Sequence, residues 1–258
     1  MRRLLGDGDP PPVRVLRPEG RSDFFLTADH AGRATPRGLG DLGVSESEMH
    51  RHIAWDIGIA GVTERLSEAL DAAAVLQAYS RLVIDCNRRP EWDTAVPTVS
   101  EETAIPGNVG ITPAQRDDRR REIFQPYHDR IAELLDARAA ASRRTVLVAM
   151  HSFTPVFKGI SRNVEVGILY NPDARDIRLP RIMLDLLRAE GDLVVGDNQP
   201  YAITGSSDYT VPVHGEARGL PHVEIEIRQD LILDTAGQGA WAARLARLLP
   251  LADKRLRG

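Results

Sequence analysis

Two histidines stand next to apolar segments and are the first residues whose types could do chemistry. His30 comes two residues after the apolar run Phe24–Ala28, and His151 directly follows residues 145–150. Two imidazoles at one sheet edge, with a carboxylate nearby, could form a catalytic zinc site with three protein ligands and an open water position. Alternatively, each histidine makes ordinary hydrogen bonds at the sheet edge. Sequence spacing does not decide between these, because no H-E-x-x-H pattern accompanies either residue.

A second candidate site follows the apolar residues 82–84, where Asp85 precedes Cys86, Asn87 and Arg88. An arginine fork can bind a carboxylate through two parallel hydrogen bonds, and a neighbouring amide can add a third. The pattern favours recognition of an acidic small molecule by Arg88. The alternative is a structural ion pair between Arg88 and an acid such as Asp85.

Two glutamates on one alternating segment are the third candidate. Glu224 and Glu226 lie two positions apart within residues 222–227, so a strand would point both carboxylates to the same side. Beside a metal-activated water, such a carboxylate is suited to shuttle a proton. The alternative is that this face of the strand is simply exposed to solvent.

Several other chemistries have no support in the sequence. Neither G-x-x-x-x-G-K-[ST] nor G-x-G-x-x-G occurs, so no phosphate-binding loop is predicted. The absence of G-x-S-x-G argues against a serine hydrolase. Cys86 is the one cysteine, which excludes an intramolecular disulfide and a multi-cysteine zinc site. A nucleophilic role for Cys86 stays open, although a small buried apolar residue is the commoner explanation.

Apolar strands alternating with helical patterns must position these residues. Strands are predicted at residues 24–28, 75–79, 82–84, 145–150, 164–170, 193–195 and 222–227. Helices are predicted from Ser45 to about residue 70, over 112–141, over 176–188 and over 238–249, with a long loop at 90–111. This order indicates an α/β fold with a mixed, mostly parallel central sheet and helices on both faces. We expect one domain over 1–258, an extended segment at 1–21, and a ligand site at the carboxyl ends of the strands.

Composition narrows the class of protein further. The chain of 258 residues is 42% hydrophobic and 27% charged, which is typical of a globular domain with a core of its own. Its net charge of −4 argues against nucleic acid as a partner. No apolar run is long enough to span a membrane, and the basic start lacks the apolar core of a signal peptide. We therefore expect a cytoplasmic protein acting on a small molecule, and the oligomeric state is not predicted.

An ordered set of motifs resembles the N-formylglutamate amidohydrolase family between about residues 22 and 250. The most specific part is Ser80-Arg81-x-x-x-Asp85-x-Asn87-Arg88. The other matching segments are Asp29-His30-Ala31-Gly32, His52-Ile53-Ala54-Trp55-Asp56-Ile57-Gly58, His151-Ser152-Phe153, Gly196-Asp197-Asn198-Gln199-Pro200-Tyr201 and Glu224-Ile225-Glu226-Ile227-Arg228.

The resemblance implies a zinc-carboxypeptidase-like fold and hydrolysis of an N-acylated amino acid. The expected substrate is N-formyl-L-glutamate, which family members cleave to formate and glutamate in histidine degradation. By position, His30 and His151 match the ligands of one zinc ion, and Glu226 matches the general base. Asn87 and Arg88 match the pair that holds the substrate carboxylate.

The third zinc ligand follows less directly from the resemblance. The carboxypeptidase pattern would place glutamate three residues after the first histidine, but position 33 is arginine. Asp56 is the expected third ligand, with Glu48 in reserve.

Four further residues are assigned to the pocket. Arg81 or Arg162 is expected to bind a second carboxylate or to stabilise the oxyanion, while Tyr201 and His214 are expected to close the pocket. The alternatives are a hydrolase of another N-acyl amino acid or a small peptide, and a non-catalytic protein that binds acidic metabolites.

Overall fold

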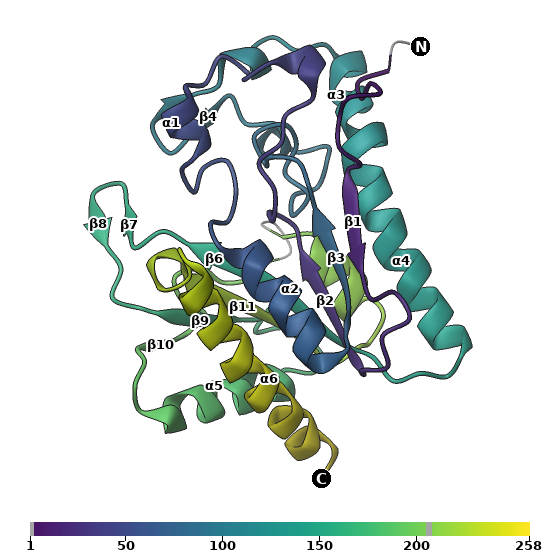
Figure 1. Cartoon of the computed structure of the whole chain (residues 1–258), viewed down its shortest axis with the longest axis vertical. Coiled ribbons are helices and arrows are strands. Elements are labelled where there is room, and N and C mark those ends of the chain that lie inside the picture. Colours follow the sequence, from purple (N-terminus) through teal and green to yellow (C-terminus); the bar gives the residue numbers. More distant parts are fainter. Residues whose placement is uncertain (1–2, 205–207) are drawn as a thin grey trace.

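The computed structural model describes residues 3–204 and 208–258, which are built around a seven-stranded sheet (Figure 1). The strand order is β1-β3-β2-β6-β11-β9-β10. The strands are β1 (Val13–Leu16), β2 (Phe24–Ala28), β3 (Ala73–Gln77), β6 (Val146–Phe153), β9 (Val166–Leu169), β10 (Val195–Asp197) and β11 (His222–Arg228). The four central strands β3, β2, β6 and β11 run parallel to one another. Strand β1 pairs antiparallel with β3, and β9 pairs antiparallel with β11. The four central strands therefore direct their carboxyl ends to one edge.

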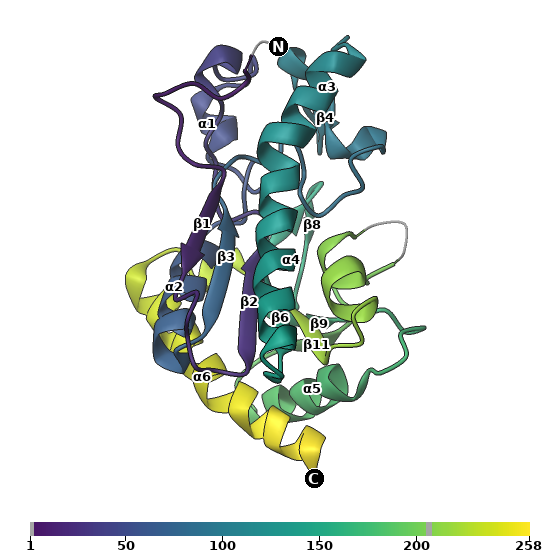
Figure 2. The same ribbon diagram turned by 90° about the vertical axis from the view of Figure 1, so that its right-hand side faces the viewer.

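Helices cover both faces of this sheet, as the apolar strands require. One face packs against α2 (Ile59–Leu70), α5 (Arg178–Glu190) and α6 (Thr235–Arg257). The other face packs against α4 (Gln125–Ala140), which continues α3 (Pro113–Arg119) through a π-helical turn at Arg120–Phe124 (Figure 2). Alternate residues of each strand serve the two layers, so that Leu26 faces the first group of helices and Phe25 faces α4. The α/β fold with a mostly parallel sheet is confirmed.

Short elements connect and extend this framework. They are α1 (Glu46–Met49), the hairpin of β4 (Val99–Ser100) with β5 (Thr103–Ala104), the hairpin of β7 (Val156–Phe157) with β8 (Ile160–Ser161), and a π-helical segment at Val211–Glu216. Both hairpins lie in segments that were expected to be loops or were left unassigned. Among the described residues, no helix is both long and apolar enough to cross a bilayer.

Two local predictions were wrong, and both differences shape the site. Residues 82–84 form turns rather than a strand, although Leu82, Val83 and Ile84 are all buried against the α4 layer. Burial alone makes such a short apolar run look like a strand. The helix expected from Ser45 to residue 70 is interrupted between α1 and α2, where Gly58 adopts a left-handed conformation at φ 82°. The N-terminal segment also contains a strand, since β1 pairs with β3.

Candidate metal centre

Three buried side chains from separate parts of the chain converge at the carboxyl edge of the sheet. His30 follows β2, His151 lies within β6, and Asp56 belongs to the turn before α2. Asp56 Oδ2 lies 3.5 Å from His30 Nδ1 and 3.0 Å from His151 Nδ1. The ligand atoms of all three side chains lie within 4.8 Å of one another. The structure therefore brings together the three residues that the sequence analysis assigned to zinc.

The donor set and its spacing fit a metal ion. Nitrogen and oxygen ligands at the usual distances from a tetrahedral zinc lie about 3.3 Å apart, close to the two separations here. His30 Nδ1 is buried and has no hydrogen-bond partner among the described residues, although such atoms are normally satisfied. All three side chains are at most 4% exposed. A site of two imidazoles and one carboxylate matches the protein ligands of catalytic zinc.

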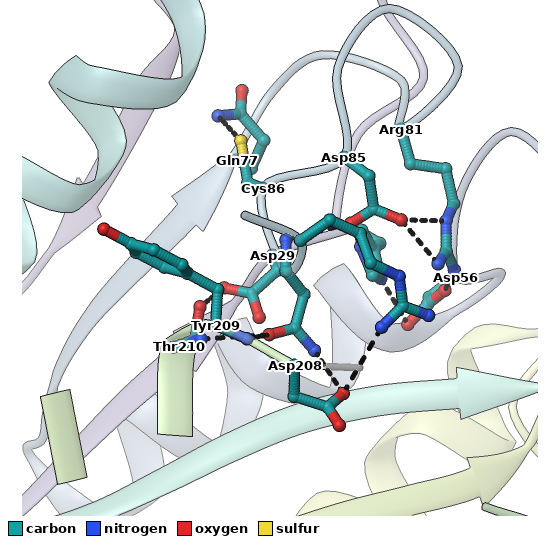
Figure 3. Close-up of polar contacts among 12 residues, drawn as sticks. Asp29, Asp56, Gln77, Arg81, Asp85, Cys86, Asp208, Tyr209 and Thr210 are labelled. Carbon is teal, nitrogen blue, oxygen red and sulfur yellow. Dashed lines mark hydrogen bonds and ion pairs between the residues drawn. The ribbon is translucent and has the colours of Figure 1, made fainter. Parts of the chain in front are cut away.

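Two further carboxylates orient the imidazole rings from behind. His30 Nε2 lies 2.7 Å from Asp85 Oδ1, and His151 Nε2 lies 3.3 Å from Asp29 Oδ2. Arg81 donates hydrogen bonds from Nε and Nη2 to Asp85 Oδ2 (Figure 3). The hydrogen bond with Asp85 engages Nε2 of His30 and leaves its Nδ1 unpartnered beside Asp56, whereas Nδ1 of His151 lies within hydrogen-bond distance of Asp56 Oδ2. Carboxylates in this position fix the tautomer and orientation of metal-binding histidines.

Asp29 is itself held by two hydroxyl groups. Its Oδ1 accepts hydrogen bonds from Tyr127 at 2.6 Å and from Thr210 at 2.9 Å. Burial alone would raise the pKa of Asp29, but His151, His30 and the hydroxyl of Tyr127 outweigh burial and lower it to about 2. Asp29 is thus a carboxylate at neutral pH, which suits its place behind His151.

Attraction between the histidines and the carboxylates of this cluster also shifts the pKa values of His151 and Asp56. Burial opposes a charge on His151, but Glu224, Asp29 and Asp56 together raise its pKa well above the usual value. Burial also opposes the charge of Asp56, yet the two histidines hold the pKa of Asp56 far below the ordinary range. The cluster therefore stabilises positive charge at its centre, where a cation would be bound.

The turn between α1 and α2 explains how Asp56 reaches the centre. Its backbone N–H donates to the carbonyl of His30 at 2.9 Å, and its Oδ2 accepts from the backbone N–H of Ser152 at 3.2 Å. Gly58 follows in a left-handed conformation, and a Cβ there would lie 2.1 Å from the carbonyl oxygen of Ile232. This tight approach ends the turn and starts α2, so the break in the predicted helix is what positions the carboxylate.

The other acidic candidate and the unexpected arginine both lie elsewhere. Glu48 contacts Arg51 and the hydroxyl of Thr103, and it is not among the described residues that line the cavity beside the centre. Arg33 lies over the ring of Trp55 at 5.8 Å. Arginine at position 33 therefore does not leave the centre without a carboxylate, because Asp56 occupies that place.

Both glutamates of β11 are buried beside the centre. Glu226 pairs in register with His151 on the neighbouring strand β6, and Glu224 lies opposite Ala149. Glu224 is 3% exposed and Glu226 is 7% exposed, so the alternative of a solvent-exposed strand face is wrong. Burial raises the pKa of Glu226 to about 7 and that of Glu224 well above its usual value. One Oε2 atom on each glutamate has no hydrogen-bond partner among the described residues.

A cavity of about 660 Å³ opens directly over this centre. Its described lining carries the metal-binding group together with both glutamates and the polar residues that follow β3. The lining includes His30, Asp56, His151, Glu224, Glu226, Arg81, Asp85, Asn87, Arg88, Tyr201 and Asp208. A cavity of this size lies within the range of ordinary small-molecule sites.

Asn87 and Arg88 meet an acid supplied by the chain itself. Asn87 Nδ2 donates to Asp208 Oδ1 at 3.2 Å, and Arg88 Nη1 lies 3.7 Å from the same oxygen. Asn87 Oδ1 accepts hydrogen bonds from the backbone N–H groups of Tyr209 and Thr210. The alternative of a structural ion pair is therefore present, with Asp208 in place of Asp85, because Asp85 binds Arg81 and His30.

Other residues named from the sequence occupy supporting positions. Tyr201 lines the cavity and accepts a hydrogen bond from Arg162, whose guanidinium stacks over the Tyr201 ring at 4.8 Å. Arg162 itself is not among the described lining residues. His214 is buried behind the site, where it pairs with His128 at 3.0 Å between ring nitrogens. Burial raises the pKa of the Cys86 thiol well above its usual value, which disfavours a nucleophilic thiolate.

Sequence reasoning missed three members of this site. Tyr127 and Thr210, which hold Asp29, are distant in sequence and belong to no local motif. Asp208 stands in a segment without periodicity, so nothing in the sequence links it to Arg88. By contrast, the positions of Asp29 and Asp85 beside apolar segments were a usable signal for the carboxylates behind the histidines.

Fold and site together define an α/β protein with a buried His–Asp–His group at the carboxyl edge of its sheet. The chain belongs to the N-formylglutamate amidohydrolase family, whose model matches residues 22–233. This confirms the resemblance found in the sequence and supports a hydrolase that acts on an amide. No curated protein sequence matches the chain significantly.

Two crystal structures resemble the chain along nearly its whole length. Gene product Atu2144 from Agrobacterium tumefaciens has a TM-score of 0.94 and 39% identity, covering 99% of this chain and 100% of that chain. An N-formylglutamate amidohydrolase from Ralstonia eutropha JMP134 has a TM-score of 0.69 and 18% identity, covering 96% of this chain and 99% of that chain. The second likeness shows a shared fold.

Proposed function

We propose that this protein is a zinc-dependent amidohydrolase that cleaves the N-acyl amide of an amino acid. The observation that carries the proposal is the buried group of His30, Asp56 and His151 lying beside Glu226 on one cavity. Family membership supports N-formyl-L-glutamate as the substrate, with formate and glutamate as products. A cytoplasmic role in histidine degradation stays a prediction that accompanies this substrate.

His30, Asp56 and His151 would hold one zinc ion, with Asp85 and Asp29 fixing the two imidazoles. When bound, zinc supplies an activated water and a Lewis acid for the acyl oxygen. The chain's own contribution is to keep both Nδ1 atoms and one carboxylate oxygen directed at a single point. Their burial, at no more than 4% exposure, strengthens every electrostatic interaction at that point.

Glu226 is the proposed general base. Its carboxyl group lines the same cavity, and a pKa raised to about 7 by burial makes it able to accept and release a proton near neutral pH. It would take the proton of the attacking water and pass it to the leaving nitrogen. Glu224, whose pKa burial also raises well above its usual value, is a neighbour without a proposed catalytic role.

Arg88 and Asn87 are proposed to orient the substrate carboxylate. Arg88 lines the cavity with a side chain that is 28% exposed, so its guanidinium can donate to an incoming carboxylate. Asn87 can add its second amide proton. Orientation of this kind makes the attack on the amide effectively intramolecular. Arg81, held by Asp85 at 2.7 Å, stays a proposed stabiliser of the oxyanion, and Arg162 with Tyr201 stays proposed for a second carboxylate.

The size of the cavity favours one further candidate within the same chemistry. About 660 Å³ is within the range that accommodates ligands considerably larger than N-formylglutamate. A longer N-acyl amino acid or a small peptide is therefore the second candidate substrate. The alternative of a non-catalytic binding protein gains no support, because Asp56 completes the group that could hold the metal.

Metal content and formate release measured on the same purified protein test this function. We expect about one zinc per chain and release of formate from N-formyl-L-glutamate, abolished by chelation and restored by zinc. N-acetyl-L-glutamate and N-formyl-dipeptides, assayed in parallel, separate the two candidate substrates. Protein that binds no metal and releases no amine from any of these substrates would contradict the proposal.

A further inference from the structure

The proposed carboxylate clamp of Asn87 and Arg88 already contains a carboxylate. Donors from both side chains approach a single oxygen, Asp208 Oδ1, at 3.2 Å from Asn87 Nδ2 and 3.7 Å from Arg88 Nη1. Figure 3 shows Asp208 beside the group that includes Asp85 and Arg81. All of these residues line the same cavity.

Asp208 is held firmly in this position from its other side. Its Oδ2 accepts a hydrogen bond from the backbone N–H of Thr204 at 3.2 Å, and its own N–H donates to the Thr204 carbonyl. The carbonyl of the Asn87 side chain binds the next two backbone N–H groups, at Tyr209 and Thr210. The carboxylate is therefore a fixed part of the clamp.

The contact between Asp208 and Arg88 is an ion pair without a hydrogen bond. At 3.7 Å it is beyond hydrogen-bond distance, and Arg88 Nη1 has no hydrogen-bond partner among the described residues. The Arg88 side chain is 28% exposed, so a second carboxylate can reach its guanidinium group while Asp208 stays in place. The negative charge of Asp208 opposes the binding of this second carboxylate, because the Asp208 carboxylate lies 3.7 Å from Arg88 Nη1 and is only 13% exposed to solvent.

The other guanidinium of the lining cannot compensate for this repulsion. Arg81 is bound to Asp85 through Nε at 3.1 Å and Nη2 at 2.7 Å, and its Nη1 lies 3.6 Å from Asp56. Of the two arginines in the described lining, Arg81 is therefore paired with two carboxylates, whereas Arg88 is paired with Asp208.

We propose that Asp208 is a specificity-determining residue that weakens the binding of carboxylates by Arg88. It partly neutralises the guanidinium, so the clamp orients a substrate carboxylate without retaining the amino-acid product tightly. This inference rests on the proposed function in one respect, namely that Asn87 and Arg88 form the carboxylate site. It adds a residue that no motif of the sequence indicates.

Calorimetric titration of the purified protein with L-glutamate tests the inference. Asp208→Asn removes the charge but keeps the shape and a hydrogen-bond acceptor, and we expect L-glutamate to bind about tenfold more tightly, in line with removing a close like charge at intermediate dielectric. The KM for N-formyl-L-glutamate should fall by a similar factor, while kcat should not rise. Asp192→Asn is the matched control, because it removes the same charge from an exposed pair with Arg244. The control should leave both quantities unchanged.

Two further variants keep the test decisive. Asp208→Ser provides a second way to remove the charge if Asp208→Asn melts at a lower temperature than the wild type. In an Arg88→Gln background, Asp208→Asn should no longer tighten binding, since the repulsion acts on a carboxylate held by Arg88.

The possible results separate this inference from the proposed function. If the wild type binds L-glutamate and charge removal leaves the affinity unchanged or weakens it, Asp208 does not act as proposed, although the clamp does. If neither the wild type nor the Asp208 variants bind L-glutamate, the clamp itself is wrong and the inference is overturned with it.

Discussion

Replacing Glu226 by glutamine tests the proposed reaction most directly. Glutamine has nearly the same shape, but it cannot accept the proton of the attacking water. Because burial raises the pKa of Glu226 to about 7, a large share of the wild-type protein carries the ionised base at neutral pH. We expect kcat to fall by about 10²–10⁴-fold, the usual contribution of general acid–base catalysis, which corresponds to about 3–5 kcal/mol in the activation barrier.

Glu224→Gln is the matched control, since it makes the same change two positions away on the same strand. Burial raises the pKa of Glu224 well above its usual value, and this carboxyl group has no proposed part in the proton transfer. Because Glu226 and not Glu224 is the proposed base, Glu224→Gln should change kcat by less than about tenfold. Neither variant should lower the melting temperature, because each replaces a buried ionisable group by one that carries no charge.

Initial rates of formate release at saturating N-formyl-L-glutamate give kcat, and metal analysis of the same samples gives the zinc content. Zinc should stay at the wild-type level in both variants, since neither glutamate is a proposed ligand. If Glu224→Gln abolished turnover while Glu226→Gln stayed active, the two roles on β11 would be exchanged. If both variants kept full activity, neither carboxyl group would be the base.

Three further predictions concern the metal, the clamp and the buried histidine pair. Replacing His30 or His151 by alanine should remove zinc without unfolding the chain, because the hydrophobic core does not depend on the metal. Full zinc occupancy in the double variant would contradict the assignment of these two ligands. Arg88→Lys keeps the charge but loses the planar fork, and kcat/KM should fall roughly thirtyfold, or about 2 kcal/mol; an unchanged value would place Arg88 outside the substrate site. His128 is buried and its pKa is lowered from 6.5 to about 4, so the unfolded chain binds its proton first as the pH falls. The free energy of unfolding should therefore fall between pH 6.5 and pH 4, by roughly 3 kcal/mol from His128 alone. Urea denaturation across this range should show a weaker pH dependence in His128→Asn, and an identical slope would refute the cause.

The sequence by itself determined the fold class and the two histidines of the metal group. Apolar strands such as Phe24–Ala28 alternate with helical patterns, and this alternation reflects burial of both sheet faces. The histidines stand next to two of these strands, and carboxyl ends of parallel strands meet at one edge, so His30 and His151 could be expected to be neighbours. These conclusions need only local periodicity and the direction of the strands.

Tertiary structure decided between the acidic candidates Asp56 and Glu48, and it decided the surroundings of the other acids of the site. Asp56 lies in the turn that ends at Gly58, where the chain does not continue one helix and where the Ile232 carbonyl leaves no room for a side chain. Asp208 meets Arg88 from 120 positions further along the chain, where no pattern marks it. Whether Glu226 is a solvated side chain or a base depends on burial beside β6, and burial is a property of the packed chain. Local sequence encodes periodicity, whereas contacts between distant residues and the desolvation that shifts a pKa arise only when the chain packs.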